Sequence, residues 1–255
     1  MSAEPARARR AYPGARKPPI PRTPRLRDIG NRLLDRLPAD EFDRLQPHLQ
    51  RVELTLKEVV HEHDREVAHV HFPITALCSP LTVLEEDDPI ETGTVGCGGF
   101  VGVPASMGVT ASPSRVISQV DGDSFRVPTA RLVEAMEAGP ALRRLLLRYA
   151  AFTLRNASQG VACNTLHTTE ARASRWMLVV HDQVGRDEFP MTPEFLAYML
   201  GVRRQTVTVI AGALQSAGMI RFRRGNMVIR DREALEEAAC ECYATIRAIY
   251  QGTVD

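Results

Sequence analysis

Four consecutive polar residues, Arg203, Arg204, Gln205 and Thr206, have the side chains best suited to contact another molecule. An arginine guanidinium group is a planar fork of N–H donors that fits a phosphate or the O6 and N7 acceptors of guanine. A glutamine amide fits the edge of adenine in the same way. If a helix presents these four groups together, they form a surface suited to nucleic acid.

Two short helices joined by a glycine turn are expected to position these side chains. Thr192 can cap the first helix, Pro193 suits its first turn, and Glu194 favours the positive end of its dipole. Gly201 can then end that helix in a left-handed conformation. The first helix has an apolar stripe of Phe195, Leu196, Met199 and Leu200. The second, starting near Arg203, has an inner face of Val207, Ile210, Ala211 and Leu214. Its outer face adds Thr208 and Val209 to the polar group.

A β-hairpin is predicted after the second helix. Residues 219–222 and 227–229 have the composition of strands, and Gly225-Asn226 between them is a hairpin turn signal. From Pro190 to Arg230 there are six arginines, including Arg223 and Arg224, and one acid, Glu194, whereas the whole chain has a net charge of +1. Such local positive charge is typical of a phosphate-binding unit, and we predict a winged helix-turn-helix that binds double-stranded DNA. The alternative is a small helical core with solvated arginines.

The composition is that of a soluble globular protein. The 255 residues are 44% hydrophobic and 25% charged, and no apolar run approaches the ~20 residues of a membrane helix. The five cysteines are scattered, which favours free thiols in a reducing cytoplasm. We therefore expect a cytoplasmic protein without a membrane partner, and no catalytic set or cofactor is predicted.

The first 27 residues differ from the rest. Residues 1–27 contain six prolines, eight basic residues and one acid, which predicts a disordered basic tail. It is interpreted as an unstructured leader, as sequence upstream of the true start, or as an arm that adds phosphate contacts.

The middle of the chain changes from a strand pattern to a helix pattern. Residues 28–50 have helical spacing, and short β-rich segments follow from Arg51 to Val127. Glycines crowd one turn between Gly93 and Gly102. We expect an α+β protein with a β-roll sensor domain over residues 28–138, a dimerisation helix over 139–166, a winged helix-turn-helix over 167–235 and a C-terminal helix over 236–255.

A heptad pattern marks the dimerisation helix. After the break at Gly139-Pro140, residues recur at alternating steps of three and four, which is typical of a helix that packs along another helix. They are Leu142, Leu145, Tyr149, Phe152, Asn156, Gln159, Cys163 and Leu166. We expect this seam to face a second copy of the chain, with Asn156 and Gln159 fixing the register. The alternative is a seam packed on the chain's own β-domain.

With these parts in order, residues 28–235 resemble the cyclic-AMP receptor protein and Fnr (Crp/Fnr) family of bacterial transcription regulators. The most specific piece is Leu200-Gly201-Val202-Arg203-Arg204-Gln205-Thr206-Val207, supported by His71-Phe72-Pro73 and Val101-Gly102. The resemblance implies a cyclic-nucleotide-binding-like β-roll and a homodimer that addresses half-sites about one helical turn apart. It implies that Arg204, Gln205 and Val209 contact bases while Arg203 and Thr206 hold phosphates. RNA polymerase is a further candidate partner.

The family's cyclic-nucleotide pocket is incomplete in this sequence. The family uses a carboxylate for the ribose and an Arg followed by Ser or Thr for the phosphate. Here the carboxylate position falls near Gly102-Val103, and Arg115 is preceded by Ser114 and followed by Val116. We expect no tight binding of cyclic AMP and an unknown effector in a pocket that includes Asn156. An iron–sulfur sensor is not expected, because no cysteine precedes Cys78.

Two other groups could bind metal. His61, His63, His69 and His71 occur in two pairs with a spacing of two, which could place them on one face of neighbouring strands. They would be the ligands in one rival interpretation, a cupin-like metal enzyme; the other rival is a constitutive DNA-binding protein with a purely structural β-roll. Cys240 and Cys242 are expected on one helix, where residues two apart point away from each other, which argues against a shared metal.

Overall fold

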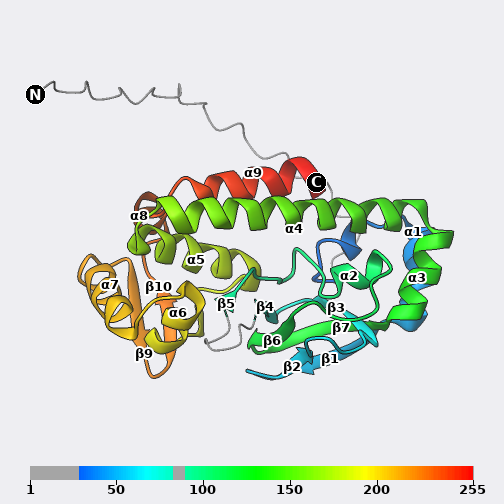
Figure 1. The fold of residues 1–255 in the computed structure, drawn as a ribbon, viewed down its shortest axis with the longest axis horizontal. Helices are drawn as coiled ribbons and strands as arrows, with labels where there is room; N and C mark the ends of the chain where they lie inside the picture. The colour runs from blue at the N-terminus through cyan, green and yellow to red at the C-terminus, as the bar shows by residue number, and fades with distance from the viewer. Residues whose placement is uncertain (1–28, 83–89, 255) are drawn as a thin grey trace, which may run out of the picture.

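The computed structural model describes residues 29–82 and 90–254, so the prediction of a basic tail over residues 1–27 lies outside the described residues. Figure 1 shows a β-rich unit beneath one long helix, with the helices and hairpin of residues 188–238 gathered at one end of that helix. This arrangement confirms the expected α+β class. No helix among the described residues is long and apolar enough to cross a membrane.

The helical region before the sheets is interrupted. It contains the 3-10 turns η1 (Leu34–Arg36) and η2 (Gln46–His48) and the helix α1 (Ala39–Leu45). Leu37 is extended, with ψ 140°, because the residue before a proline disfavours the helical region. The helical spacing expected over residues 28–50 is therefore divided at Leu37-Pro38, and the apolar spacing correctly marks the buried residues Leu33, Leu34 and Leu45.

Two antiparallel sheets form the β-roll. One has the order β1 (Gln50–Leu54), β7 (Gly122–Pro128), β3 (His69–Pro73). The other has the order β2 (Val59–His61), β6 (Arg115–Val120), β4 (Leu77–Thr82), β5 (Ile90–Glu91). A short helix, α2 (Val103–Ser106), follows the glycine-rich turn. In that turn a Cβ on Gly99 would overlap the Tyr149 hydroxyl, so the glycine allows the roll to close on the long helix.

The first half of the seam predicted on the long helix is buried within this chain. After α3 (Thr129–Ala138), the helix α4 (Pro140–Leu166) starts at the predicted break. Its seam residues Leu142, Tyr149 and Phe152 are buried in one cluster with Phe72 and Phe100 of the β-roll and with the C-terminal helix α9 (Cys242–Val254). Figure 1 shows α9 running along α4. The structure therefore favours the alternative of a seam packed on the chain's own β-domain, and it adds α9 as a further partner, because a heptad stripe accepts any complementary helix, including one from the same chain. We call this side the closed face of α4.

A second apolar stripe on α4 remains uncovered in the described structure. Leu147 is 42% exposed, Leu154 is 70% exposed and Val161 is 69% exposed. These residues are seven apart, so they line one side of the helix. We call this stripe the open face of α4. Single exposed apolar residues are common on protein surfaces, but three in one row indicate a surface that contacts another molecule.

The C-terminal part contains α5 (Thr169–Val184), β8 (Glu188–Pro190), α6 (Pro193–Leu200), α7 (Arg204–Ser216), β9 (Ile220–Arg223), β10 (Asn226–Ile229) and α8 (Arg232–Ala238). The single helix expected over residues 236–255 is wrong. Ala239 is extended, with ψ 152°, so α8 ends before it and α9 begins at Cys242. Cys240 lies in this link, and Cys240 and Cys242 do not share a regular helix.

Candidate nucleic-acid interface

The first helix of the interface begins and ends as its sequence indicates. The Thr192 hydroxyl caps α6 by accepting a hydrogen bond from the Phe195 backbone N–H at 3.1 Å. Gly201 ends the helix in the left-handed region, with φ 63°, and the Val202 N–H returns to the Ala197 carbonyl at 3.0 Å. Because no other residue type reaches this conformation as cheaply, the angle between the two helices depends on Gly201.

The second helix, α7, presents the polar group outward. Arg203 is its N-cap, and Arg204, Gln205 and Thr206 form its exposed first turn. One turn further on, Val209 is 73% exposed. Its inner face is buried against the rest of the unit by Val207, Ile210, Ala211 and Leu214. The structure therefore brings the predicted contact residues together at the N-terminal end of one exposed helix.

The basic side chains on this surface are free to bind. Of the six arginines between Pro190 and Arg230, the one ion pair found in the described part of the chain joins Arg204 to Glu194, at 3.9 Å. Both side chains are largely exposed, 69% and 74%, so solvent screening leaves this contact weak. A phosphate or a base edge can replace Glu194 at little cost.

The predicted wing forms, with one correction and one additional strand. Strands β9 and β10 pair from Asn226 with Arg223, so the two-residue turn is Arg224-Gly225, one residue earlier than predicted. Both turn residues have positive φ, 49° and 85°, as a turn that follows the twist of a hairpin requires. The short segment before α6 also forms a strand, β8, which adds a third strand beside β10.

The wing is held to α7 by a side chain that the sequence did not single out. The Gln215 side-chain oxygen accepts a hydrogen bond from the Phe222 N–H at 2.9 Å. Arg223 and Arg224 are exposed at the tip of the wing. The wing and the first turn of α7 are thus parts of one rigid unit that carries positive charge at both places.

The candidate effector residues divide into two groups. Gly102, Val103, Ser114 and Asn156 line a cavity of about 440 Å³ between the β-roll and α4. Arg115 is not among its lining residues; instead its Nε–H donates to Glu62 Oε1 at 2.8 Å, and this hydrogen bond lowers the pKa of Glu62. Among the described residues that line the cavity, none carries a permanent charge. The arginine expected to hold a phosphate is therefore used elsewhere.

The four histidines do not form one site. His61 and His71 are buried with ring centroids 6.0 Å apart, whereas His63 lies beyond the end of β2, half exposed beside Asp64. Burial, then the neighbouring charges, lower the pKa of His71 to about 3. The shared face predicted from the spacing of two is wrong for the first pair, because β2 ends at His61 after an irregularity in its pairing with β6. The four histidines therefore cannot serve together as the metal ligands of a cupin-like enzyme.

A half-buried acid joins the β-roll to the C-terminal unit, and no sequence pattern pointed to it. The two carboxylate oxygens of Glu91 accept hydrogen bonds from Trp176 Nε1 and the Ser79 hydroxyl, both at 2.9 Å. Burial raises the pKa of Glu91 to about 7, although these two hydrogen bonds and Arg175 act in the opposite direction. Glu91 keeps some solvent-accessible surface, but each of its two carboxylate oxygens has a hydrogen-bond partner within the protein. Glu91 therefore links β5 to α5 through a contact that depends on its protonation.

Comparison with known proteins supports this description of the C-terminal unit. Residues 171–238 match the family model described as a Crp-like helix-turn-helix domain. No curated protein sequence matches the chain.

Solved structures share the larger fold at low identity. FixK2 from Bradyrhizobium japonicum is 16% identical, with a TM-score of 0.64 over 75% of this chain and 98% of its own. A putative Crp/Fnr-family transcriptional regulator from Eubacterium rectale is 15% identical, with a TM-score of 0.62 over 81% and 97%. The c-di-GMP-responsive global regulator CLP from Xanthomonas campestris is 15% identical, with a TM-score of 0.59 over 75% and 99%. At such identities the likeness establishes the fold.

Proposed function

We propose that this chain, a Crp/Fnr-type protein with a Crp-like helix-turn-helix domain at residues 171–238, regulates transcription by binding specific double-stranded DNA sites as a homodimer. The observation that carries the proposal is the exposed polar first turn of α7, held by a capped helix, a glycine turn and a basic wing. We propose a cytoplasmic location, which a DNA partner supports.

We assign roles to the exposed residues by their position on α7. Arg204, Gln205 and Val209 would contact base edges in the major groove, since they lie on the outer side of the helix. Arg203 and Thr206, at the helix N-terminus, would hold phosphates, where the helix dipole favours an anion. Arg223 and Arg224 would hold the backbone beside the wing. Thr192 would contribute indirectly, by capping α6 and so fixing where that helix begins.

The open face of α4 is the surface we propose for the homodimer. Leu147, Leu154 and Val161 form a stripe of heptad spacing, and a second copy of the same helix supplies the matching stripe. The closed face is less suited, because Leu142, Tyr149 and Phe152 are already buried with the β-roll and α9. In such a two-fold symmetric dimer, the two copies of α7 would bind half-sites about one helical turn of DNA apart.

The effector we propose for the β-roll is uncharged rather than a cyclic nucleotide. The cavity beside Asn156 has no permanent charge among its described lining residues, and Arg115 is paired with Glu62. An anion buried there would lack a counter-charge. Calorimetry with cyclic AMP should show no binding; micromolar affinity would contradict this assignment. We propose that the cavity acts on DNA binding through α4, by changing the relative angle of the two DNA-binding units near Asn156. Asn156→Leu should then alter DNA affinity without contacting DNA. Intact dimers with unchanged DNA affinity would count against this mechanism.

DNA binding can be tested without knowing the target. Selection from a random duplex library, together with genome-wide mapping of bound sites, should enrich one motif with two related halves. Arg204→Ala should then lower affinity for the enriched site by about 10- to 100-fold, the effect of about 1–3 kcal/mol per specific contact. It should lower affinity for an unrelated duplex much less.

Two further variants complete the test. Arg224→Ala should weaken binding to both duplexes equally and reduce the salt dependence, as expected for a phosphate contact. The matched control is Arg44→Ala, an exposed arginine on α1 paired with Asp40, which should change nothing. A protein that binds no duplex at low ionic strength would refute the proposal. Binding unaffected by cell extract would favour the constitutive alternative.

A further inference from the structure

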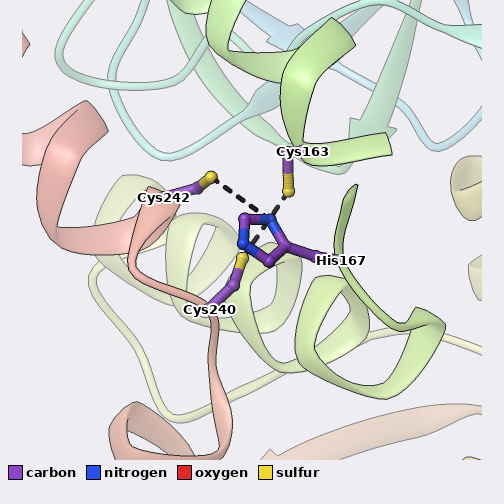
Figure 2. Close-up of side chains that lie close together, drawn as sticks. All are labelled: Cys163, His167, Cys240 and Cys242. Atoms are coloured by element: carbon purple, nitrogen blue, oxygen red, sulfur yellow. Dashed lines mark hydrogen bonds between the residues drawn. The ribbon is translucent and has the colours of Figure 1, made fainter. Parts of the chain in front are cut away.

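A compact group of four potential metal ligands lies where α4 gives way to the C-terminal unit. The ligand atoms of Cys163, His167, Cys240 and Cys242 all lie within 4.8 Å of one another. Figure 2 shows the three sulfur atoms around the imidazole ring, with side chains contributed by two segments of the chain. Within residues 29–82 and 90–254, no other group of three or more histidine, cysteine or acidic side chains could hold a metal ion.

Backbone geometry at two helix ends brings these ligands together. Cys163 is in the last turn of α4, and His167 caps that helix in an extended conformation, its N–H returning to the Cys163 carbonyl at 3.1 Å. Cys240 lies in the link after α8, where the Tyr243 N–H binds its carbonyl at 3.0 Å, and Cys242 begins α9. Because Cys240 precedes the helix, Cys240 and Cys242 can point to a common centre.

The distances suit a single tetrahedral ion. Cys163 Sγ lies 3.6 Å from Cys240 Sγ, and Cys242 Sγ lies 3.6 Å from His167 Nδ1. A tetrahedral Zn²⁺ with Zn–S bonds of about 2.3 Å and a Zn–N bond of about 2.0 Å separates two sulfurs by about 3.7 Å, and sulfur from nitrogen by about 3.5 Å. The cysteines are free thiols, so no disulfide competes for these sulfur atoms.

The surroundings of the group are those of a metal site rather than of buried apolar thiols. His167 Nε2 lies 3.0 Å from Glu241 Oε2, which leaves Nδ1 as the atom that faces the sulfurs. A carboxylate that receives the second ring N–H is the usual partner of a ligating histidine, because it fixes the tautomer and the ring orientation. The Gln159 Nε2 group donates to Cys242 Sγ at 3.0 Å, which stabilises a thiolate.

Nearby positive charge supports the same conclusion. Three thiolates bound to one Zn²⁺ leave a net charge of −1 at the site. Arg175 of α5 interacts electrostatically with Cys163, and Arg172 with both Cys163 and Cys240. These two arginines can balance the remaining negative charge, as a buried anionic centre requires.

We propose that Cys163, His167, Cys240 and Cys242 bind one Zn²⁺ as a structural site that fastens the start of α9 to the end of α4. All four positions of the tetrahedron are filled by protein atoms, so there is no open position for catalysis. The ion would tie together three neighbouring elements, α4, the turn into α5 and the link between α8 and α9. This site also explains why α9 closes one face of α4, and it does not depend on DNA binding.

Metal analysis of the purified full-length chain tests the site. Protein expressed with zinc and purified under reducing conditions without chelators should contain about one zinc ion per chain. Protein stripped of metal and refilled with Co²⁺ should show the intense visible bands of tetrahedral cobalt–thiolate coordination. A zinc content far below one with no cobalt bands would overturn the proposal, as would iron and acid-labile sulfide in place of zinc.

Matched variants assign the ligands. Cys240→Ser and Cys242→Ser should lose the zinc and lower the thermal midpoint by about 10 °C or more, since metal binding stabilises the folded state. Cys97→Ser, a half-buried thiol outside the group, should keep about one zinc ion. Zinc retained in both Cys240→Ser and Cys242→Ser would overturn the assignment. Where a serine variant does not fold, the cobalt spectrum and zinc content of the unaltered chain decide.

The role of Glu241 separates metal coordination from a simple hydrogen-bonded cluster. Glu241→Gln should keep the zinc but weaken its affinity about 10- to 100-fold in competition with a chelator, the usual effect of removing a ligand's carboxylate partner. An unchanged zinc affinity would contradict coordination through His167 Nδ1.

Discussion

The two faces of α4 carry similar apolar patterns, but one face is buried in the folded chain and the other is exposed. The closed face has Leu142, Tyr149 and Phe152 buried with α9, whereas the open face leaves Leu154 and Val161 about 70% exposed. The closed stripe follows steps of three and four, and the open stripe recurs at every seventh residue of the same helix. The difference teaches that a heptad pattern identifies a helix with a partner but does not say which partner.

The closed face is also the more polar of the two where it meets the C-terminal unit. It continues through Asn156 and Gln159 to Cys163. A sequence-based interpretation assigns such polar residues to register control between two chains. In the structure Asn156 lines the β-roll cavity and Gln159 donates to Cys242. The polar positions therefore serve contacts within the chain.

The largest expected effect comes from the closed face. Phe152→Ala removes a ring that is 8% exposed and packs against Tyr149 and Tyr250, so it should cost about 3–5 kcal/mol of unfolding free energy at every protein concentration. Urea denaturation measures it. Leu154→Ala, two residues away, is the control and should change the monomer by less than about 0.5 kcal/mol. Equal costs would remove the distinction between the two faces.

The open face should respond to charge rather than to lost packing. Two glutamates, in Leu154→Glu with Val161→Glu, place like charges in the proposed dimer contact. They should raise the dimer dissociation constant by about a hundredfold, or about 2.7 kcal/mol. Sedimentation velocity measures this, and circular dichroism should show the same fold. A dimer of unchanged stability would show that the open face is not the interface.

A titratable contact lies near the closed face, since Glu91 lines a second cavity, next to the one described above, together with Tyr149, Phe152 and Asn156. Burial raises the pKa of Glu91 to about 7, above the usual 4.5, so the folded chain holds an extra proton between those values. Stability should therefore fall as pH rises through this window, by on the order of 2 kcal/mol. Thermal midpoints from pH 4.5 to 8 should fall less in Glu91→Gln than in the unaltered chain. Parallel pH profiles would contradict the assigned pKa.

The smallest effect concerns the far end of the closed face. The Tyr250 hydroxyl donates to the Gly98 carbonyl at 2.7 Å, which joins α9 to the glycine turn. Tyr250→Phe should cost about 1 kcal/mol, the net value of one hydrogen bond. Guanidinium denaturation is the measurement. A loss as large as that of Phe152→Ala would mean that the hydroxyl, and not the apolar packing, holds α9.

The helix-turn-helix could be predicted because its signals are local. The Thr192 cap, the Gly201 turn and the apolar stripe on α7 each depend on residues a few positions apart, and the structure has all three. The wing was predicted with its turn displaced by one residue, since Asn226 and Gly225 both tolerate positive φ and only strand register decides between the two turns.

The histidines and cysteines show where such prediction stops. His61 and His63 have strand spacing, but β2 ends between them. Cys163 and Cys240 are far apart in the sequence, and no spacing rule joins them, yet their sulfur atoms lie 3.6 Å apart. A ligand set assembled at two helix ends depends on where those helices stop and how they cross, which is settled by packing.

For this protein, the order of amino acids alone determined the two helices and the hairpin of the helix-turn-helix, and that Arg203 and Arg204 begin an exposed helix, because capping and periodicity act over a few neighbouring residues. Tertiary structure decided that α9 covers one face of α4, that Arg115 pairs with Glu62, and that Cys163, His167, Cys240 and Cys242 converge. Those outcomes depend on which of several complementary surfaces pack against each other, and this packing involves residues far apart in the sequence.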